Sequence, residues 1–119
     1  MRSAAAFFLL SFTAMVSSAA ATFPATDAAT HAGETGTVIG VLSNVHKGRG
    51  SLLFLDIGGV YPDNVFSGVL FMHGPDINFD SLVGKTLAIT GKIKMYHGKP
   101  EIIIDSAAQV GIARPGAGN

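Results

Sequence analysis

The sequence predicts an all-β domain of five strands, with one short helix between the third strand and the fourth. Three observations support this prediction. Five segments are rich in β-branched and other apolar residues, and several alternate between apolar and polar positions. Turns that contain glycine or proline separate these segments, and the chain of 119 residues has 15 glycines. Only residues 78–84 carry the terminal signals of a helix.

The first three predicted strands are residues 37–45, 51–57 and 65–72. β-Branched residues dominate the first strand, and its internal glycine indicates a bend or a close approach of another backbone. In the second strand, alternate side chains point to opposite faces. Leucine and isoleucine occupy one face, so Phe54 and Asp56 lie on the other. A glycine within the third strand indicates another kink.

The helix candidate, residues 78–84, begins at a capping asparagine or aspartate and ends at a glycine. Residues 85–96 form the clearest strand, because apolar and polar positions alternate along it. A tight turn at 97–98 leads into the fifth strand, residues 99–105. Three strands, a short helix and two strands is the chain order of the OB-fold, a five-stranded Greek-key barrel that is partly open. A small β-sandwich, the alternative, needs more than five strands.

Residues 1–21 have the pattern of a secretory signal peptide. Arg2 supplies a positive charge, residues 4–16 form an uncharged apolar run, and small residues follow up to Ala21. The run is shorter than the roughly 20 apolar residues that cross a bilayer, so we expect no membrane span in the mature chain. This pattern predicts a periplasmic or secreted protein of a bacterial type. The alternative is a buried N-terminal helix.

Three further segments follow the predicted signal peptide. Residues 22–35 are rich in Ala, Thr, Gly and Pro without periodicity, so we expect a flexible lead-in. Residues 36–113 form the predicted OB-fold domain, and residues 114–119 are expected to be a flexible tail. A domain of this size buries only about 60% of the surface of its unfolded chain, and without cysteine it must rely on its core alone.

Composition and motifs favour binding over catalysis. Eight Lys and Arg balance eight Asp and Glu, so the overall charge does not point to nucleic acid. The chain has no cysteine and therefore no thiol nucleophile. It contains no G-x-S-x-G elbow, no P-loop, no zinc-binding spacing of histidines and no calcium-loop pattern. We therefore predict no catalytic residue, no metal site and no cofactor.

A nuclease of the staphylococcal type, which also uses an OB barrel, is the enzyme alternative. Such an enzyme needs a cluster of metal-binding carboxylates and arginines that neutralise the phosphate. Arg49 is the only arginine in the predicted domain, which argues against this alternative.

Residues 84–110, GKTLAITGKIKMYHGKPEIIIDSAAQV, resemble the last two strands of small exported OB-fold domains in the nucleic-acid-binding superfamily. The shared pattern is a Gly-Lys pair, an apolar strand with Thr-Gly, a Tyr-x-Gly-x-Pro-Glu-Ile turn and a Gln-Val close. It matches Gly84-Lys85, Thr90-Gly91 and residues 96–102, and upstream Phe54 to Gly58 and Tyr61-Pro62 resemble the second strand and its turn. The resemblance implies nucleic-acid or oligosaccharide binding on the face of strands two and three.

On that fold, cationic residues of the loop after strand one and the loop after strand four would meet at one rim. Aromatic side chains nearby would stack on bases or sugars. The predicted ligand-binding residues are Lys47, Arg49, Phe54, Tyr61, Lys92, Lys94, Tyr96, His97 and Lys99. The predicted ligand is single-stranded nucleic acid or another anionic oligomer, such as an anionic oligosaccharide, bound weakly and in a salt-sensitive way because few cations are available.

Each of these signals also has a structural interpretation. Lysines on an outer strand face keep the sheet soluble and discourage edge pairing. Tyrosines at turns are often structural, and Phe54 could be buried beneath the helix. The alternative function is a protein–protein accessory module of an envelope or secreted complex, which the low charge and the apolar strand VFSGVLFM favour.

Overall fold

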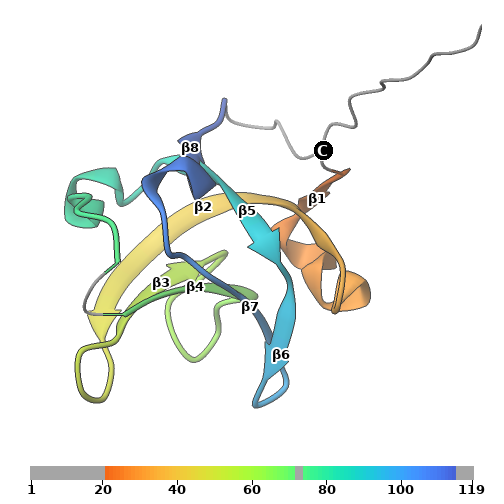
Figure 1. Cartoon of the computed structure of the whole chain (residues 1–119), viewed down its shortest axis with the longest axis horizontal. Coiled ribbons are helices and arrows are strands. Elements are labelled where there is room, and N and C mark those ends of the chain that lie inside the picture. Colours follow the sequence, from red (N-terminus) through yellow and green to blue (C-terminus); the bar gives the residue numbers. More distant parts are fainter. Residues whose placement is uncertain (1–20, 72–73, 115–119) are drawn as a thin grey trace, which may run out of the picture.

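The computed structural model describes residues 21–71 and 74–114. These residues form an OB-like fold of one strongly curved sheet with short 3-10 helices (Figure 1). The elements in chain order are β1 (Ala21–Pro24), η1 (Ala25–His31), β2 (Thr35–Lys47), β3 (Leu53–Ile57), β4 (Phe66–Leu70), η2 (Phe79–Leu82), β5 (Thr86–Lys92), β6 (Lys94–Tyr96), β7 (Lys99–Ile103), η3 (Ala107–Gln109) and β8 (Val110–Ile112). Within the described ranges, no helix has the length and apolar character needed to cross a membrane.

Strand β2 organises the sheet because it pairs with different partners along its length. Its residues 35–41 pair antiparallel with β5, and its second half pairs antiparallel with β3. A register shift between Leu42 and Asn44 marks the place where the partner changes. The chain continues as a meander through β3 and β4. Because β5 returns beside β2, the first four predicted strands have the Greek-key order 4-1-2-3.

The expectation of a partly open five-stranded barrel differs from the structure in two respects. The sheet has eight strands in the order β6-β7-β4-β3-β2-β5-β8, with β1 added against β2, and its end strands β6 and β8 do not pair. The fourth predicted strand is interrupted at Ile93, whose N–H donates to Glu34 O instead of continuing the ladder (2.9 Å). Its two parts, β5 and β6, pair with β2 and β7, so the sheet curls without closing (Figure 1).

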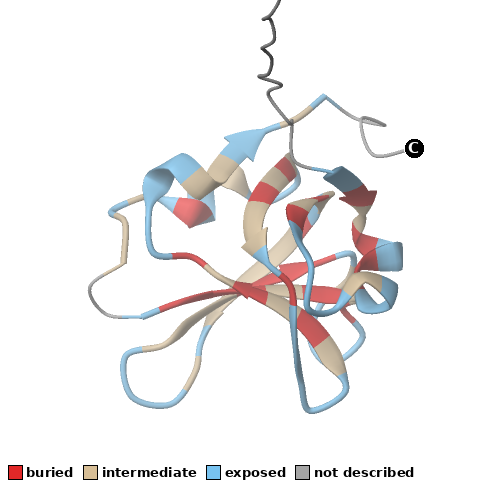
Figure 2. Ribbon diagram, turned by 45° about the vertical axis from the view of Figure 1, so that its right-hand side comes forward, coloured by how far each residue is buried: buried red, intermediate tan, exposed pale blue. Residues whose placement is uncertain are grey.

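The core lies inside this curl, and the alternation of apolar residues fills it (Figure 2). Leu55 and Ile57 of β3 and Leu87 and Ile89 of β5 are each at most 1% exposed. Full burial of such a side chain contributes about 1.5–3 kcal/mol. The glycine within β2, Gly40, permits the predicted close approach, since a Cβ there would lie 2.9 Å from the Cβ of Ala25.

Residues 22–31, part of the segment expected to be a flexible lead-in, instead take part in the fold. Strand β1 runs parallel to β2, and helix η1 buries Ala25 and Ala28 in the core. Phe23 is also buried, and its ring stacks on His31 with centroids 3.7 Å apart. Gly36 makes this pairing possible, because a Cβ at that position would lie 2.7 Å from the Phe23 ring. The described fold therefore includes residues N-terminal to position 36.

The short helix predicted between the third and fourth strands is present as η2, between β4 and β5. It is a single 3-10 turn, and Asn78 occupies the N-cap position without a side-chain hydrogen bond. Phe79 anchors it, since this side chain is 2% exposed and belongs to the core. Most of the predicted signal peptide (residues 1–20) and most of the predicted tail (residues 115–119) lie outside the described residues.

Candidate ligand-binding groove

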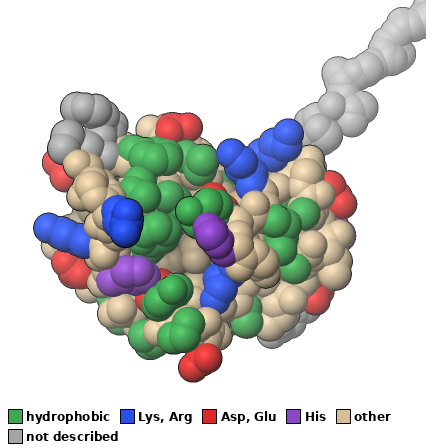
Figure 3. Space-filling view, turned by 90° about the horizontal axis from the view of Figure 1, so that it is seen from below, with side chains coloured by type: hydrophobic (Ala, Val, Ile, Leu, Met, Phe, Trp, Pro, Cys, Tyr) green, Lys and Arg blue, Asp and Glu red, His purple; other side chains and the backbone are tan. Residues whose placement is uncertain are grey.

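A groove of about 630 Å³ crosses the face of β3 and β4 that points away from the core. The end of β2 and the β6–β7 hairpin flank it, and the loop of residues 58–65 contributes to its wall. Its lining residues are His46, Lys47, Gly48, Phe54, Tyr61, Pro62, Ser67, Tyr96, His97, Lys99 and Glu101. Figure 3 shows hydrophobic and histidine side chains gathered on this side of the molecule, with Lys and Arg side chains around them.

Aromatic rings dominate the groove. Phe54 of β3 stacks on His46, its partner across the β2–β3 ladder, with ring centroids 5.2 Å apart. The Tyr61 ring is tilted against His46, and Tyr96 meets His97 edge to face at 4.1 Å. Tyr61 and Tyr96 are 64% and 58% exposed, so much of their surface is open to a ligand. Such rings are stacking surfaces for bases or sugars.

Asp56 lies directly beneath these rings and is fully buried. Its Oδ2 accepts from Tyr61 N (3.2 Å) and Asn44 Nδ2 (3.4 Å), and it lies 3.1 Å from His46 Nδ1. A proton on His46 Nδ1 therefore donates to Asp56, which fixes the orientation of the imidazole ring against Phe54. The strand alternation placed Asp56 outside the core, and the loop of residues 58–65 provides the cover that buries it.

Lys99 braces the groove wall. Its ammonium group donates to Pro62 O (2.8 Å), Asn64 O (2.6 Å) and Asn64 Oδ1 (2.9 Å). A lysine has three such protons, so these bonds use all of them. Nζ also lies 5.9 Å from the centroid of the Tyr61 ring. Lys99 thus ties β7 to the loop of residues 58–65, while its predicted contact with a ligand stays a prediction.

We expect the substitution Lys99→Met to lower the free energy of unfolding by about 1.5 kcal/mol, because two acceptors on the buried Asn64 and the exposed carbonyl of Pro62 lose a charged donor while the aliphatic stem is kept. Urea unfolding followed by circular dichroism measures this loss. Lys92→Met is the matched control: Lys92 is exposed, and a surface change of this kind stays within about 0.5 kcal/mol. Equal effects of the two substitutions would contradict the bracing role.

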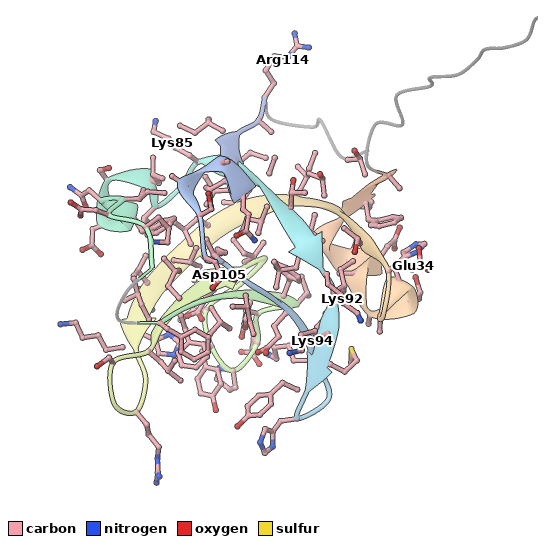
Figure 4. The ribbon with its side chains drawn as sticks, viewed as in Figure 1. Glu34, Lys85, Lys92, Lys94, Asp105 and Arg114 are labelled. Carbon is pink, nitrogen blue, oxygen red and sulfur yellow. The ribbon has the colours of Figure 1, made fainter. Side chains whose placement is uncertain are left out.

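The predicted basic rim is only partly assembled. Lys47 lines the groove, but Arg49 projects from the exposed loop of residues 48–52 and is not among the lining residues. Lys92 is the last residue of β5 and Lys94 is the first residue of β6 (Figure 4), and neither lines the groove. Lys92 pairs across the ladder with Thr35, at the end of β2 remote from His46. The cationic residues that were expected to meet at one rim are therefore spread over separate parts of the fold.

Glu101 adds a negative group to the groove. It lies on β7 opposite Lys94 of β6, and it is half-buried. Burial disfavours the charged form and raises the pKa of the Glu101 carboxyl, while the positive charge of Lys94 opposes this change to a smaller extent. Because the folded-state pKa is raised, this group contributes most stability at low pH, and the contribution is lost as the pH rises through the folded-state pKa.

Sequence reasoning missed several groove residues, namely His46, Gly48, Pro62, Ser67 and Glu101, together with the buried Asp56. A signal for Glu101 was available, because alternation along β7 places it on the same face as Lys99. Gly48 carries a second signal: a Cβ there would overlap the Phe54 ring, so glycine is needed beneath that ring. Among the described residues, no three His, Asp or Glu side chains gather as metal ligands.

No protein-family model matches this chain, and no curated protein shows a significant match. The fold is similar to part of a protein assigned as an aspartyl-tRNA synthetase from Leishmania major Friedlin, with a TM-score of 0.55 and 10% identity over 93% of this chain. This chain spans only 24% of that chain's length. The likeness shows a shared fold and nothing more.

Two further solved structures have lower scores. The telomere capping protein Ten1 from Saccharomyces pombe has a TM-score of 0.44 and 14% identity, with coverage of 84% of this chain and 86% of that chain. The S. pombe Stn1-ten1 complex has a TM-score of 0.45 and 14% identity, with coverage of 84% and 82%.

Proposed function

We propose that this protein is a binding module that holds a short single-stranded nucleic acid in the groove over β3 and β4, without catalysing a reaction. The observation that carries the proposal is the set of rings from Phe54, Tyr61 and Tyr96 on one groove, beside two histidines. The corresponding face of OB-folds binds oligonucleotides and oligosaccharides. Base stacking on such rings contributes about 1–3 kcal/mol per base and does not depend strongly on sequence.

The electrostatics of the groove specify how salt affects this binding. Lys47 lines the groove and Arg49 lies close by in sequence, whereas Lys99 is engaged with loop carbonyls. Each phosphate contact with a single strand changes the slope of log affinity against log salt by about −0.7. One or two contacts therefore give a slope of about −0.7 to −1.4. Stacking, and not phosphate contact, supplies most of the affinity in this proposal.

We expect the protein to bind a fluorescein-labelled nine-nucleotide oligo(dT) with an affinity that weakens only about three- to sevenfold when NaCl rises from about 50 to 200 mM. Fluorescence anisotropy measures both values. The same sequence as a duplex serves as the control, because its bases are not free to stack on the rings. No saturable binding at low salt overturns the proposal, and a much steeper salt slope would place the contacts outside the groove.

Export is a second part of the proposal, based on the leader pattern of residues 1–21. The mass of the chain recovered from the periplasm or medium tests it, since cleavage after Ala21 leaves a chain that begins at Thr22. Such a chain keeps Phe23, the buried residue of β1.

A protein partner is the second candidate function, and a second hollow of about 410 Å³ favours it. Leu52, Leu53, Leu70 and Phe71 line this hollow, and Phe71 is 50% exposed. These apolar side chains, beside the polar Lys47 and Ser51 that also line the hollow, suit a protein contact of mixed character. The substitution Phe71→Ser separates the two functions, because it leaves the aromatic groove intact.

A further inference from the structure

Glu101 is the one carboxylate side chain among the groove-lining residues, and its surroundings suggest a role in recognition. Its register partners are Lys94 on β6 and Ser67 on β4, so it stands between a cation and a hydroxyl group. Neither of the ion pairs formed by described residues within 4.0 Å involves Glu101. A half-buried acceptor with few partners is a candidate for ligand recognition, because a hydrogen bond from a ligand offsets the free-energy cost of removing the acceptor from water.

The neighbouring Ser67 complements this acceptor. Its Oγ accepts a hydrogen bond from Asn64 Nδ2 at 2.9 Å, which leaves the hydroxyl proton to donate elsewhere. Ser67 also lines the groove. The groove therefore presents, side by side, a carboxyl group that accepts through two oxygens and a hydroxyl group that can donate.

These two groups favour one kind of base. A carboxylate repels phosphates and accepts best from two adjacent N–H donors. Guanine displays such a pair on its Watson–Crick edge, at N1 and the 2-amino group, beside the acceptor O6. Cytosine and adenine each display one amino group there, and the N3–H of thymine lies between two carbonyl oxygens. The donor and acceptor pattern of guanine is thus the complement of Ser67 and Glu101.

We propose that Glu101, with Ser67 beside it, reads the Watson–Crick edge of a single guanine held between the rings of the groove. This inference rests on the proposed function and makes it more specific, because it gives the module a base preference. Glu101 is then a specificity-determining residue, and Lys94 across the ladder limits the loss of its negative charge.

The test compares labelled nine-nucleotide oligonucleotides that differ only at the central base. In a background of thymine, the central position carries thymine, guanine, inosine or cytosine, and a single guanine avoids self-association. We expect the guanine oligonucleotide to bind about tenfold more tightly than oligo(dT), in line with a bidentate contact to a base. Inosine, which lacks the 2-amino group, is expected to lose most of this advantage.

The substitution Glu101→Gln is expected to abolish the guanine preference, because the neutral amide offers one acceptor oxygen where the carboxylate offers two. Asp105→Asn is the matched control: Asp105 lies just after β7, is exposed and does not line the groove (Figure 4). It removes the same charge and is expected to preserve the preference. Thermal unfolding of both variants checks that they are folded.

The outcomes separate the two proposals. If oligo(dT) binds but the four oligonucleotides bind equally, or if Glu101→Gln keeps the guanine preference, the recognition role of Glu101 is wrong and the binding module stands. If no oligonucleotide binds, including oligo(dT), the proposed function fails and the inference fails with it.

Discussion

Replacing Asp56 by alanine is expected to lower the free energy of unfolding by about 3 kcal/mol, because a fully buried hydrogen-bond acceptor is removed. The substitution leaves Asn44 Nδ2 and Tyr61 N without their acceptor and releases His46. Loss of the partner of a buried donor costs about 1–3 kcal/mol, and partial access of water to these part-buried donors reduces the total. Urea unfolding with linear extrapolation measures the change.

Two further variants make the interpretation specific. Asp56→Asn keeps the size and one acceptor oxygen, so a smaller loss is expected. Asp63→Ala removes an exposed carboxylate from the loop of residues 58–65 and is expected to change stability by less than about 0.5 kcal/mol. If Asp56→Ala lowered the free energy of unfolding no more than Asp63→Ala, the hydrogen bonds of Asp56 beneath the rings would not contribute to stability.

Phe54→Ala is expected to weaken the binding of oligo(dT) about thirtyfold, equivalent to about 2 kcal/mol, because the central stacking surface of the groove is lost. Phe54 lies on the groove floor, stacks on His46 and covers Gly48. The substitution therefore removes the Phe54 ring and leaves the His46 ring without its stacking partner. Anisotropy titration of the variant and of the unmodified protein under the same salt conditions gives the ratio.

Phe54→Leu distinguishes stacking from apolar contact, since leucine keeps much of the volume but has no aromatic face. We expect it to lose nearly as much affinity as alanine. Tyr96→Ala provides an independent check, because Tyr96 is 58% exposed and its removal should alter affinity with little effect on stability. Retained affinity in both Phe54 variants would mean that the ligand binds elsewhere.

Much of the fold could be predicted because side-chain alternation is a local property. The predicted strands at 51–57 and 99–105 contain β3 and β7, and the predicted strand at 85–96 contains β5 and β6. The division at Ile93 was not predictable, because it depends on hydrogen bonds to Gly33 and Glu34 from a distant segment. The strand β1 was missed for a related reason: its pairing depends on space left by Gly36 and not on its own apolar content.

The candidate site was predicted less completely than the fold. Six of the nine predicted residues line the groove, namely Lys47, Phe54, Tyr61, Tyr96, His97 and Lys99, and their contact with a ligand stays a prediction. Strand alternation and turn position place aromatic rings well. Charges are harder to place, since Lys99 finds its partners among backbone carbonyls of another loop. A sequence pattern gives no sign of such partners.

The loop of residues 58–65 is held from two sides, by Lys99 of β7 at Pro62 and Asn64 and by Asp56 of β3 at the N–H of Tyr61. One wall of the groove is therefore already in place before any ligand arrives. A ligand then loses its own conformational freedom on binding but requires little ordering of the protein, which reduces the entropic cost of association. Preorganisation of this kind lets a small surface with few charges reach a useful affinity.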